Sequence, residues 1–255
     1  MEFKLNIFKK PVAKKPSLNA ELDRQQCFIK EALDRANRRE RQSDIHACGR
    51  LIFAIDLTES RETSLVQARI AIEAMFNAIT VIGRVKMMLA WYRGENECKK
   101  SQWYDNPSAL APSMQKLLCK FGRTQIARLM RMAMAEGDAI SGMVFVGDHC
   151  EEDSKILFAL AEALGKLSIP LFIFQECKDE EYPTLRAKEM FKQMADLSGG
   201  IYLEFKPDNC MVLPEALTSV AAFSLAGSEG VRQIGSPKTP EALQLHGRLL
   251  IGNGR

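Results

Sequence analysis

The residues best suited to chemistry follow one apolar segment. Asp56 comes directly after Leu51–Ile55, and Thr58 and Ser60 occupy the next two alternate positions. A carboxylate and two hydroxyls in one turn are hard oxygen ligands, which suit Mg²⁺, Mn²⁺ or a similar cation better than zinc. This spacing therefore predicts a metal-centred binding site.

Two later residues complete this candidate site. Thr124 follows a glycine–arginine pair, and Asp148 follows a second apolar segment, Met143–Gly147. In proteins with an open parallel sheet, ligands bind outside the carboxyl ends of the strands. Side chains that are distant in sequence converge there. The predicted metal ligands are Asp56, Thr58, Ser60, Thr124 and Asp148.

The elements that must position these residues alternate between strand and helix. Strands are predicted over residues 51–55, 85–92, 99–104, 143–146, 171–174 and 201–205, and helices over 64–82, 107–118, 124–136, 153–167, 185–197 and 214–225. This alternation indicates a mostly parallel sheet with helices on both faces. Residues 99–104 follow a turn centred on Gly94 and are expected to form a short antiparallel edge strand. The predicted fold class is therefore α/β, a three-layer Rossmann-like domain.

The two ends of the chain differ from this central part. Residues 1–18 are basic and contain two prolines, which indicates a flexible arm, and residues 19–42 predict a charged helix with a thin apolar stripe. Beyond Gly227 the chain is rich in Gly, Pro and Ser, which predicts a disordered tail in which Glu241–Ile251 can dock as a short helix. The expected divisions are 1–49, 50–226 and 227–255.

Composition excludes several classes of protein. The 255 residues are 46% apolar and 26% charged, an ordinary globular balance. No apolar run reaches the roughly 18 residues of a membrane span, and the charged first ten residues do not form a signal-peptide core. The seven cysteines lack C-x-x-C spacing and the three histidines lack zinc-ligand spacing. We therefore expect a reduced, cytoplasmic protein without zinc.

Charge is concentrated near the N-terminus. Residues 1–50 hold 12 Lys/Arg against 7 Asp/Glu. Such a segment can contact nucleic acid or an anionic surface by charge alone, but no DNA- or RNA-reading motif accompanies it. We therefore do not expect specific nucleic-acid binding.

The proposed metal residues also resemble those of the von Willebrand factor A-type (VWA) domain family, over about residues 50–225. That family has Asp-x-Ser-x-Ser after its first strand, a Thr before a central helix and an Asp after its fourth strand. Asp56, Thr58, Ser60, Thr124 and Asp148 stand at these positions. The ending Leu197-Ser198-Gly199-Gly200-Ile201-Tyr202 is similar to the family's last helix-to-strand turn.

The resemblance implies a metal-ion-dependent adhesion site, or MIDAS. In that site hydroxyls bind Mg²⁺ directly, carboxylates act largely through water, and an acidic side chain of a partner protein completes the metal shell. The implied function is a protein-binding adaptor or scaffold of the bacterial cytoplasm, without catalysis and with a partner that the sequence does not identify.

The sequence departs from the family pattern at two places. Thr58 replaces the first serine of the motif, and His149 stands where a glycine commonly follows the second aspartate. Four acidic residues, Glu59, Glu151, Glu152 and Asp153, are expected to crowd the rim. Their charges favour a metal but repel an acidic partner. These departures leave three alternatives open: the site is self-occupied, it is suited to a neutral or basic ligand, or it is not adhesive.

Two other hypotheses use the same residues. Asp56 with Glu59, and Asp148 with Glu151, have the Asp-x-x-Glu spacing of a helix N-terminus, so each aspartate can be a cap in a site without metal. Alternatively, Asp56 is the nucleophile of a Mg²⁺-dependent phosphatase or phosphotransferase that resembles the haloacid dehalogenases. Most of those phosphatases carry a second Asp where this chain has Thr58.

Overall fold

Apolar strands that are buried on both faces form the centre of the molecule. The computed structural model describes residues 18–40, 49–59, 62–79, 82–136, 140–177, 182–206 and 208–251. The strands are β1 Gly49–Asp56, β2 Val85–Arg93, β3 Glu97–Tyr104, β4 Gly142–Gly147, β5 Leu171–Glu176 and β6 Tyr202–Phe205. They form one sheet in the order β3-β2-β1-β4-β5-β6, in which only β2 and β3 pair antiparallel. The predicted fold class is confirmed.

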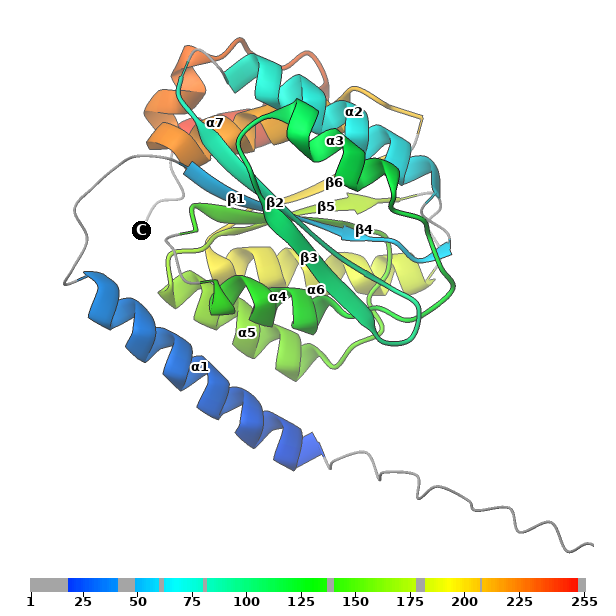
Figure 1. Cartoon of the computed structure of the whole chain (residues 1–255), viewed down its shortest axis with the longest axis vertical. Helices are drawn as coiled ribbons and strands as arrows, with labels where there is room; N and C mark the ends of the chain where they lie inside the picture. The colour runs from blue at the N-terminus through cyan, green and yellow to red at the C-terminus, as the bar shows by residue number, and fades with distance from the viewer. Residues whose placement is uncertain are drawn as a thin grey trace, which may run out of the picture.

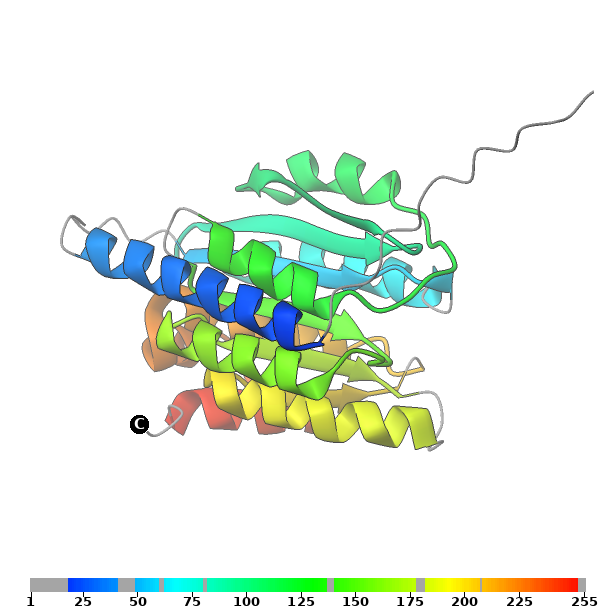
Figure 2. The ribbon, with the colours of Figure 1, turned by 90° about the horizontal axis from the view of Figure 1, so that it is seen from below.

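Helices cover both faces of this sheet (Figures 1 and 2). One face carries α2 Glu62–Ile79, α3 Pro107–Gln115, α7 Val212–Gln233 and α8 Pro240–Ile251, and the other carries α4 Ile126–Ala135, α5 Ser154–Lys166 and α6 Tyr182–Ser198. Side chains alternate along a strand, so Phe53 of β1 packs into the first layer and Ile52 into the second. Residues 51–55 of β1 are apolar and buried on both faces of the sheet, which fits the continuous apolar run in the sequence.

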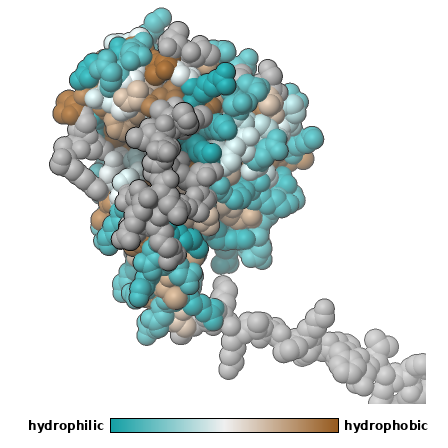
Figure 3. Space-filling view, turned by 60° about the vertical axis from the view of Figure 1, so that its left-hand side comes forward, coloured by the Kyte–Doolittle hydropathy of each residue, from teal (hydrophilic) through white to brown (hydrophobic). Residues whose placement is uncertain are grey.

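The charged N-terminal helix, α1 Leu18–Glu40, packs lightly on the second layer, beside α5. Its thin apolar stripe contacts the core, while its outer side is mostly hydrophilic in Figure 3. One buried polar residue fixes it: the Gln25 amide donates to Ile156 O at 2.7 Å and accepts from Arg131 at 2.8 Å. The predicted arm before α1 lies outside the described residues.

The prediction of a disordered tail from residue 227 is wrong for the described residues up to 251. The chain turns back sharply at Gly227, whose φ is 60°, so that a Cβ on Gly230 would lie 2.2 Å from Ala222 O. These glycines therefore permit a tight turn and a close approach between helical segments. Helix α8 then packs on α7, with Leu245 and Leu249 buried, as the docked-helix alternative anticipated.

No described helix combines the length and the apolar character needed to cross a lipid bilayer.

The Gln25 contacts yield a first prediction. Gln25→Ala leaves Arg131 and Ile156 O without these partners, and an unsatisfied buried group costs about 1–3 kcal/mol. We expect faster amide hydrogen exchange along α1 and unchanged exchange in β1 and β4. Gln26→Ala, at the exposed neighbouring position, is the control and should leave α1 protected. Equal exchange in the two variants would show that Gln25 does not hold α1.

A second prediction concerns α8. His246 is 4% exposed, its Nδ1 lies 3.1 Å from the Ser219 hydroxyl of α7, and burial lowers the pKa of its imidazole. The unfolded chain therefore takes up this proton first, so stability is full above about pH 6.5 and falls as pH drops through the lower folded pKa. Thermal melts between pH 7.5 and 5.5 should show this loss in the wild type and a smaller loss in His246→Gln. Identical pH slopes would contradict this account.

Candidate functional site

The two predicted aspartates lie at neighbouring strand ends. β1 and β4 are adjacent, with Ile55 in register with Val146, so Asp56 and Asp148 follow at the same edge of the sheet (Figure 1, right-hand side). Asp56 is 1% exposed and Asp148 is 4% exposed. Buried carboxylates need compensating hydrogen bonds or cations, which makes this edge the natural place for a charged ligand.

The turn after β1 is fixed by Asp56 itself. Its Oδ1 accepts a hydrogen bond from the backbone N–H of Thr58 at 2.7 Å, and Thr58 is half-buried. The predicted ligand Ser60 lies outside the described residues. Asp56 lies six positions before Glu62, the first residue of α2.

Asp148 is not a helix cap. The N-cap of α5 is Asp153, whose Oδ1 accepts from Lys155 N at 2.8 Å. Instead, Asp148 Oδ1 accepts from the backbone N–H of His149 at 2.8 Å, and His149 Nδ1 lies 3.3 Å from the same oxygen. The helix-cap hypothesis is therefore wrong for Asp148.

The fourth predicted ligand, Thr124, belongs to a reciprocal clamp between two loops. Its Oγ1 accepts from Glu151 N at 3.1 Å, while the carboxylate of Glu152 accepts from Ile126 N and, at 3.0 Å, from Ala127 N. Helix α4 makes no cap hydrogen bond through its own N-cap side chain, so Glu152 caps it from the other loop. The clamp joins the loop of Thr124 to the loop of Asp148.

Glu152 therefore does not crowd the rim as predicted. It points inward, where burial raises the pKa of its carboxyl and the α4 hydrogen bonds oppose that shift. The negative charge also lies at the positive end of the α4 dipole, a favourable position.

The buried hydroxyl of Tyr92 lies close enough to the acidic groups to be affected by their charges. Tyr92 lies in register with Asp56 on the neighbouring strand and is fully buried. Its pKa is well above the usual value because of burial first, and then because of the charges of Asp56, Glu152 and Asp148. Three carboxylates thus act on one hydroxyl, which gives this edge a negative potential that favours a cation.

Gln175 is a buried residue of β5 that was not predicted to belong to the site, and it holds the backbone of Asp148 by a hydrogen bond. Its amide nitrogen donates to Asp148 O at 3.0 Å and to Thr184 O at 3.2 Å, and its oxygen accepts from Tyr202 OH at 2.7 Å. A glutamine directly after the apolar run 171–174 was the available signal, since a polar group on a central strand needs such partners.

The 117–125 segment, which joins α3 to α4, forms the other side of the site. Lys120 N donates to Leu57 O at 3.0 Å, which attaches the segment directly beside Asp56. Gly122 packs on the hairpin turn, and a Cβ added there would lie 2.1 Å from Gly94 O. The glycine is therefore required for this close approach.

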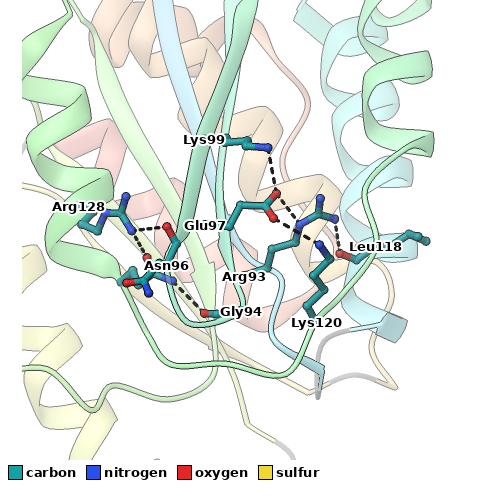
Figure 4. A network of polar contacts seen from close by, with 9 residues as sticks. Arg93, Gly94, Asn96, Glu97, Lys99, Leu118, Lys120 and Arg128 are labelled. Carbon is teal, nitrogen blue, oxygen red and sulfur yellow. Dashed lines mark hydrogen bonds and ion pairs between the residues drawn. The ribbon is translucent and has the colours of Figure 1, made fainter. Parts of the chain in front are cut away.

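Polar contacts hold the segment against the β2–β3 hairpin (Figure 4). Arg93 donates to Glu97 Oε1 and to Leu118 O, both at 2.7 Å, and Lys120 and Lys99 lie 3.5 and 3.6 Å from the same carboxylate. Slight burial raises the pKa of Glu97, but the Arg93 hydrogen bond and the nearby cations lower it on balance.

The helix end of the segment is tied to the same hairpin. Gln125 Nε2 donates to Gly94 O at 3.1 Å, and Arg128 donates to Asn96 O at 2.9 Å (Figure 4). The 117–125 segment is thus held at both ends, next to the predicted metal residues.

The surface of this segment is apolar and basic. Leu118 is 67% exposed and Phe121 is 79% exposed, and the side chains of Lys120 and Arg123 are also exposed. Large exposed apolar groups beside a polar site are typical of binding surfaces.

The donor set fits a hard divalent cation. It consists of two carboxylates and the threonine hydroxyls, all oxygen, with Ser60 outside the described residues. In the part of the chain that the structure describes, no group of three or more His, Cys, Asp or Glu side chains is placed to hold a metal ion. The proposed set, which has only two acidic members, is not a group of that kind.

Comparisons with known proteins support the fold. No protein-family profile and no curated protein sequence matches the chain. Among solved structures it is similar to a von Willebrand factor type A protein from Catenulispora acidiphila, with 14% identity, a TM-score of 0.53, and coverage of 71% of this chain and 43% of that chain. An aerotolerance-related membrane protein from Bacteroides fragilis has 14% identity, a TM-score of 0.50, and coverage of 68% and 96%.

A third similar structure is proximal thread matrix protein 1 from the mussel byssus with a zinc-occupied MIDAS motif. It has 10% identity, a TM-score of 0.50, and coverage of 69% of this chain and 46% of that chain. The chain thus spans less than half the length of the first and third of these proteins. At such identities the comparison shows the fold, and the protein has a VWA-type fold.

The clamp yields a prediction. Glu152→Ala removes the acceptor of two α4 N–H groups, and loss of such buried, charge-assisted bonds costs about 1–3 kcal/mol. We expect a lower midpoint in urea and faster amide exchange at Ile126 and Ala127. Glu151→Ala is the matched control, because its side chain is exposed and only its backbone N–H bonds to Thr124. Equal stability of the two variants would rule out the clamp as a stabilising contact.

Proposed function

We propose that the protein is a metal-ion-dependent protein-binding module, an adaptor or scaffold without catalysis of its own. The supporting observation is that Asp56 and Asp148 lie at neighbouring strand ends of a VWA-type sheet, with Thr58 in the loop of Asp56 and with Thr124 in a loop that is hydrogen-bonded to the loop of Asp148. A similar fold with zinc in its MIDAS motif, that of the mussel protein, adds support for a divalent cation here.

The burial of these side chains divides their roles. The half-buried hydroxyls of Thr58 and Thr124 would bind Mg²⁺ or Mn²⁺ directly, together with Ser60. The more deeply buried carboxylates of Asp56 and Asp148 would supply negative charge from behind them. The cation would supply an electrophilic centre that attracts an oxygen ligand, and the protein residues would orient it without neutralising it fully.

The rim suits a partner that carries an acidic side chain. Repulsion by the predicted acidic rim is reduced, because Glu152 is engaged with α4. On the opposite side, Lys120 and Arg123 offer positive charge, and Leu118 and Phe121 offer apolar contact area. A carboxylate of the partner would approach the cation while its neighbouring residues contact the 117–125 segment.

No observation favours the phosphatase alternative. Its general acid would stand at Thr58, which has no acidic group, and Thr124 precedes a helix instead of ending a strand. The seven cysteines are odd in number, scattered and without C-x-x-C spacing, which supports placing this module in a reducing compartment such as a bacterial cytoplasm.

Metal titration tests the proposed function. Isothermal titration of chelator-treated protein with Mg²⁺ and with Mn²⁺ should show binding in the wild type. Asp56→Asn keeps an acceptor for Thr58 N but removes the charge, and Thr124→Val replaces a hydroxyl, which is also the acceptor of Glu151 N in the clamp, by a methyl group. We expect each variant to lose about 10–100-fold in affinity, the usual effect of changing groups that support a metal.

The control is Glu162→Gln, which removes one exposed carboxylate from α5 and should titrate as the wild type does. An assay with p-nitrophenyl phosphate and Mg²⁺ separates the phosphatase alternative, for which Asp56 would be essential. Undiminished metal affinity in Asp56→Asn would refute the proposed site.

A further inference from the structure

A groove of about 730 Å³ runs along β6, at the end of the sheet opposite β3. Its floor is β6 with Lys206 directly after it, and its walls are α6, through Lys188 and Lys192, and α8, through Glu241 at its start, Leu245 in its middle and Arg248 in its last turn. Figure 2 shows both helices, α6 in yellow and α8 in red, at this end of the sheet. The volume lies within the range of about 300–1,000 Å³ typical of ligand pockets.

The floor of the groove is an unpaired strand edge. Ile173 N donates to Ile201 O at 3.0 Å, and Cys177 N donates to Phe205 O at 2.9 Å. Backbone groups alternate in direction along a strand, so residues 201, 203 and 205 face β5. Tyr202 and Glu204 therefore direct their N–H and C=O groups away from β5, into the groove.

The side chains of these two residues leave the edge open. Glu204 pairs with Lys188 of α6 at 2.5 Å, and the Tyr202 ring lies 6.0 Å from Lys192 Nζ while its hydroxyl binds Gln175. Both side chains are thus held toward the α6 face of the sheet. An open edge between two helical walls has the form of a site for strand addition.

The opposite wall carries an acceptor that lacks a partner. Glu241 Oε2 is buried and has no hydrogen-bond partner among the described residues. A buried carboxylate oxygen left in this state is costly, and a lysine or arginine side chain would complement its charge. The wall itself is firmly placed, because Glu215 of α7 accepts from Thr239 N at 2.9 Å at the start of α8.

We propose that this groove binds one extended segment of a partner polypeptide, added to β6 as a seventh strand, with a lysine or arginine facing Glu241. A second copy of this chain would bring its own α6 and α8 to the contact, and the helical walls of the two copies would collide. An isolated strand has no such walls. The proposal is independent of the metal site.

The test uses an array of synthetic peptides of alternating threonine and valine, with one lysine placed at each position in turn, and a matching array with glutamate. Glu204→Pro removes the outward N–H and leaves the β5 pairing intact, since proline is tolerated on an edge strand. Glu204→Ala removes the same side chain but keeps the N–H. We expect lysine peptides to bind the wild type and Glu204→Ala, and to bind Glu204→Pro at least tenfold more weakly.

Glu241→Gln should abolish the preference for lysine over glutamate while weaker binding remains. Binding to Glu204→Pro as tight as to the wild type, or no binding of any peptide to the wild type, would overturn the proposal. Equal binding of the two arrays to the wild type would overturn the requirement for a basic residue.

Amide hydrogen exchange of the wild type gives a second test, which does not depend on whether the Glu204→Pro variant folds. The free protein should exchange quickly at Tyr202 and Glu204 and slowly at Leu203 and Phe205. A bound peptide should slow the exchange of Tyr202 and Glu204 only. If the peptide leaves the exchange of these two amides unchanged, the proposal is overturned.

Discussion

The loops at the carboxyl edge of the sheet depend on one constraint, the need to satisfy carboxylates that are withdrawn from water. Each of the three acidic groups is bound by backbone N–H groups: Asp56 by Thr58, Asp148 by His149, and Glu152 by the first turn of α4. These bonds stabilise the charges and also fix the loops that carry them. Burial is the main reason why the pKa of Tyr92 is raised, and the charges of these carboxylates raise it further; the same charges make a cation favourable here, so loop order and affinity for a cation have a common physical cause.

The sequence predicted the features that depend on local patterns. Apolar runs located the strands, and because carboxyl ends of parallel strands share an edge, they also brought Asp56 and Asp148 together. The cap of α4 could not be predicted in this way, since Glu152 is 26 positions away from the N–H group of Ile126 that it binds. A docked helix over Glu241–Ile251 was predicted, but the order of the chain from residue 227 onward was missed, because glycine marks both disorder and tight turns and only the packing at Gly230 distinguishes them.

The two sides of the proposed site differ in how they are held. On the β4 side the clamp holds the half-buried Glu152 carboxylate by two backbone hydrogen bonds, so a substitution there affects stability as well as binding. On the hairpin side the ion pairs around Glu97 are exposed and contribute little energy each, and the position of the 117–125 segment depends more on the Gly122–Gly94 contact and on backbone bonds to Leu57. Apolar and basic side chains on that segment can therefore vary without disturbing the fold, which is the usual condition for a surface that determines partner choice.

The two edges of the sheet are also treated differently. β3 is an eight-residue edge strand that exposes Lys99 and Lys100, and charged side chains of this kind discourage pairing with another strand. β6 has no lysine of its own, and the lysines of α6 hold its side chains to one face without covering its backbone. If the only requirement were to prevent aggregation, both edge strands would be expected to carry charged side chains that prevent pairing. The asymmetry is better explained if β3 is protected from pairing while the narrow groove at β6 admits a single strand and excludes a whole sheet.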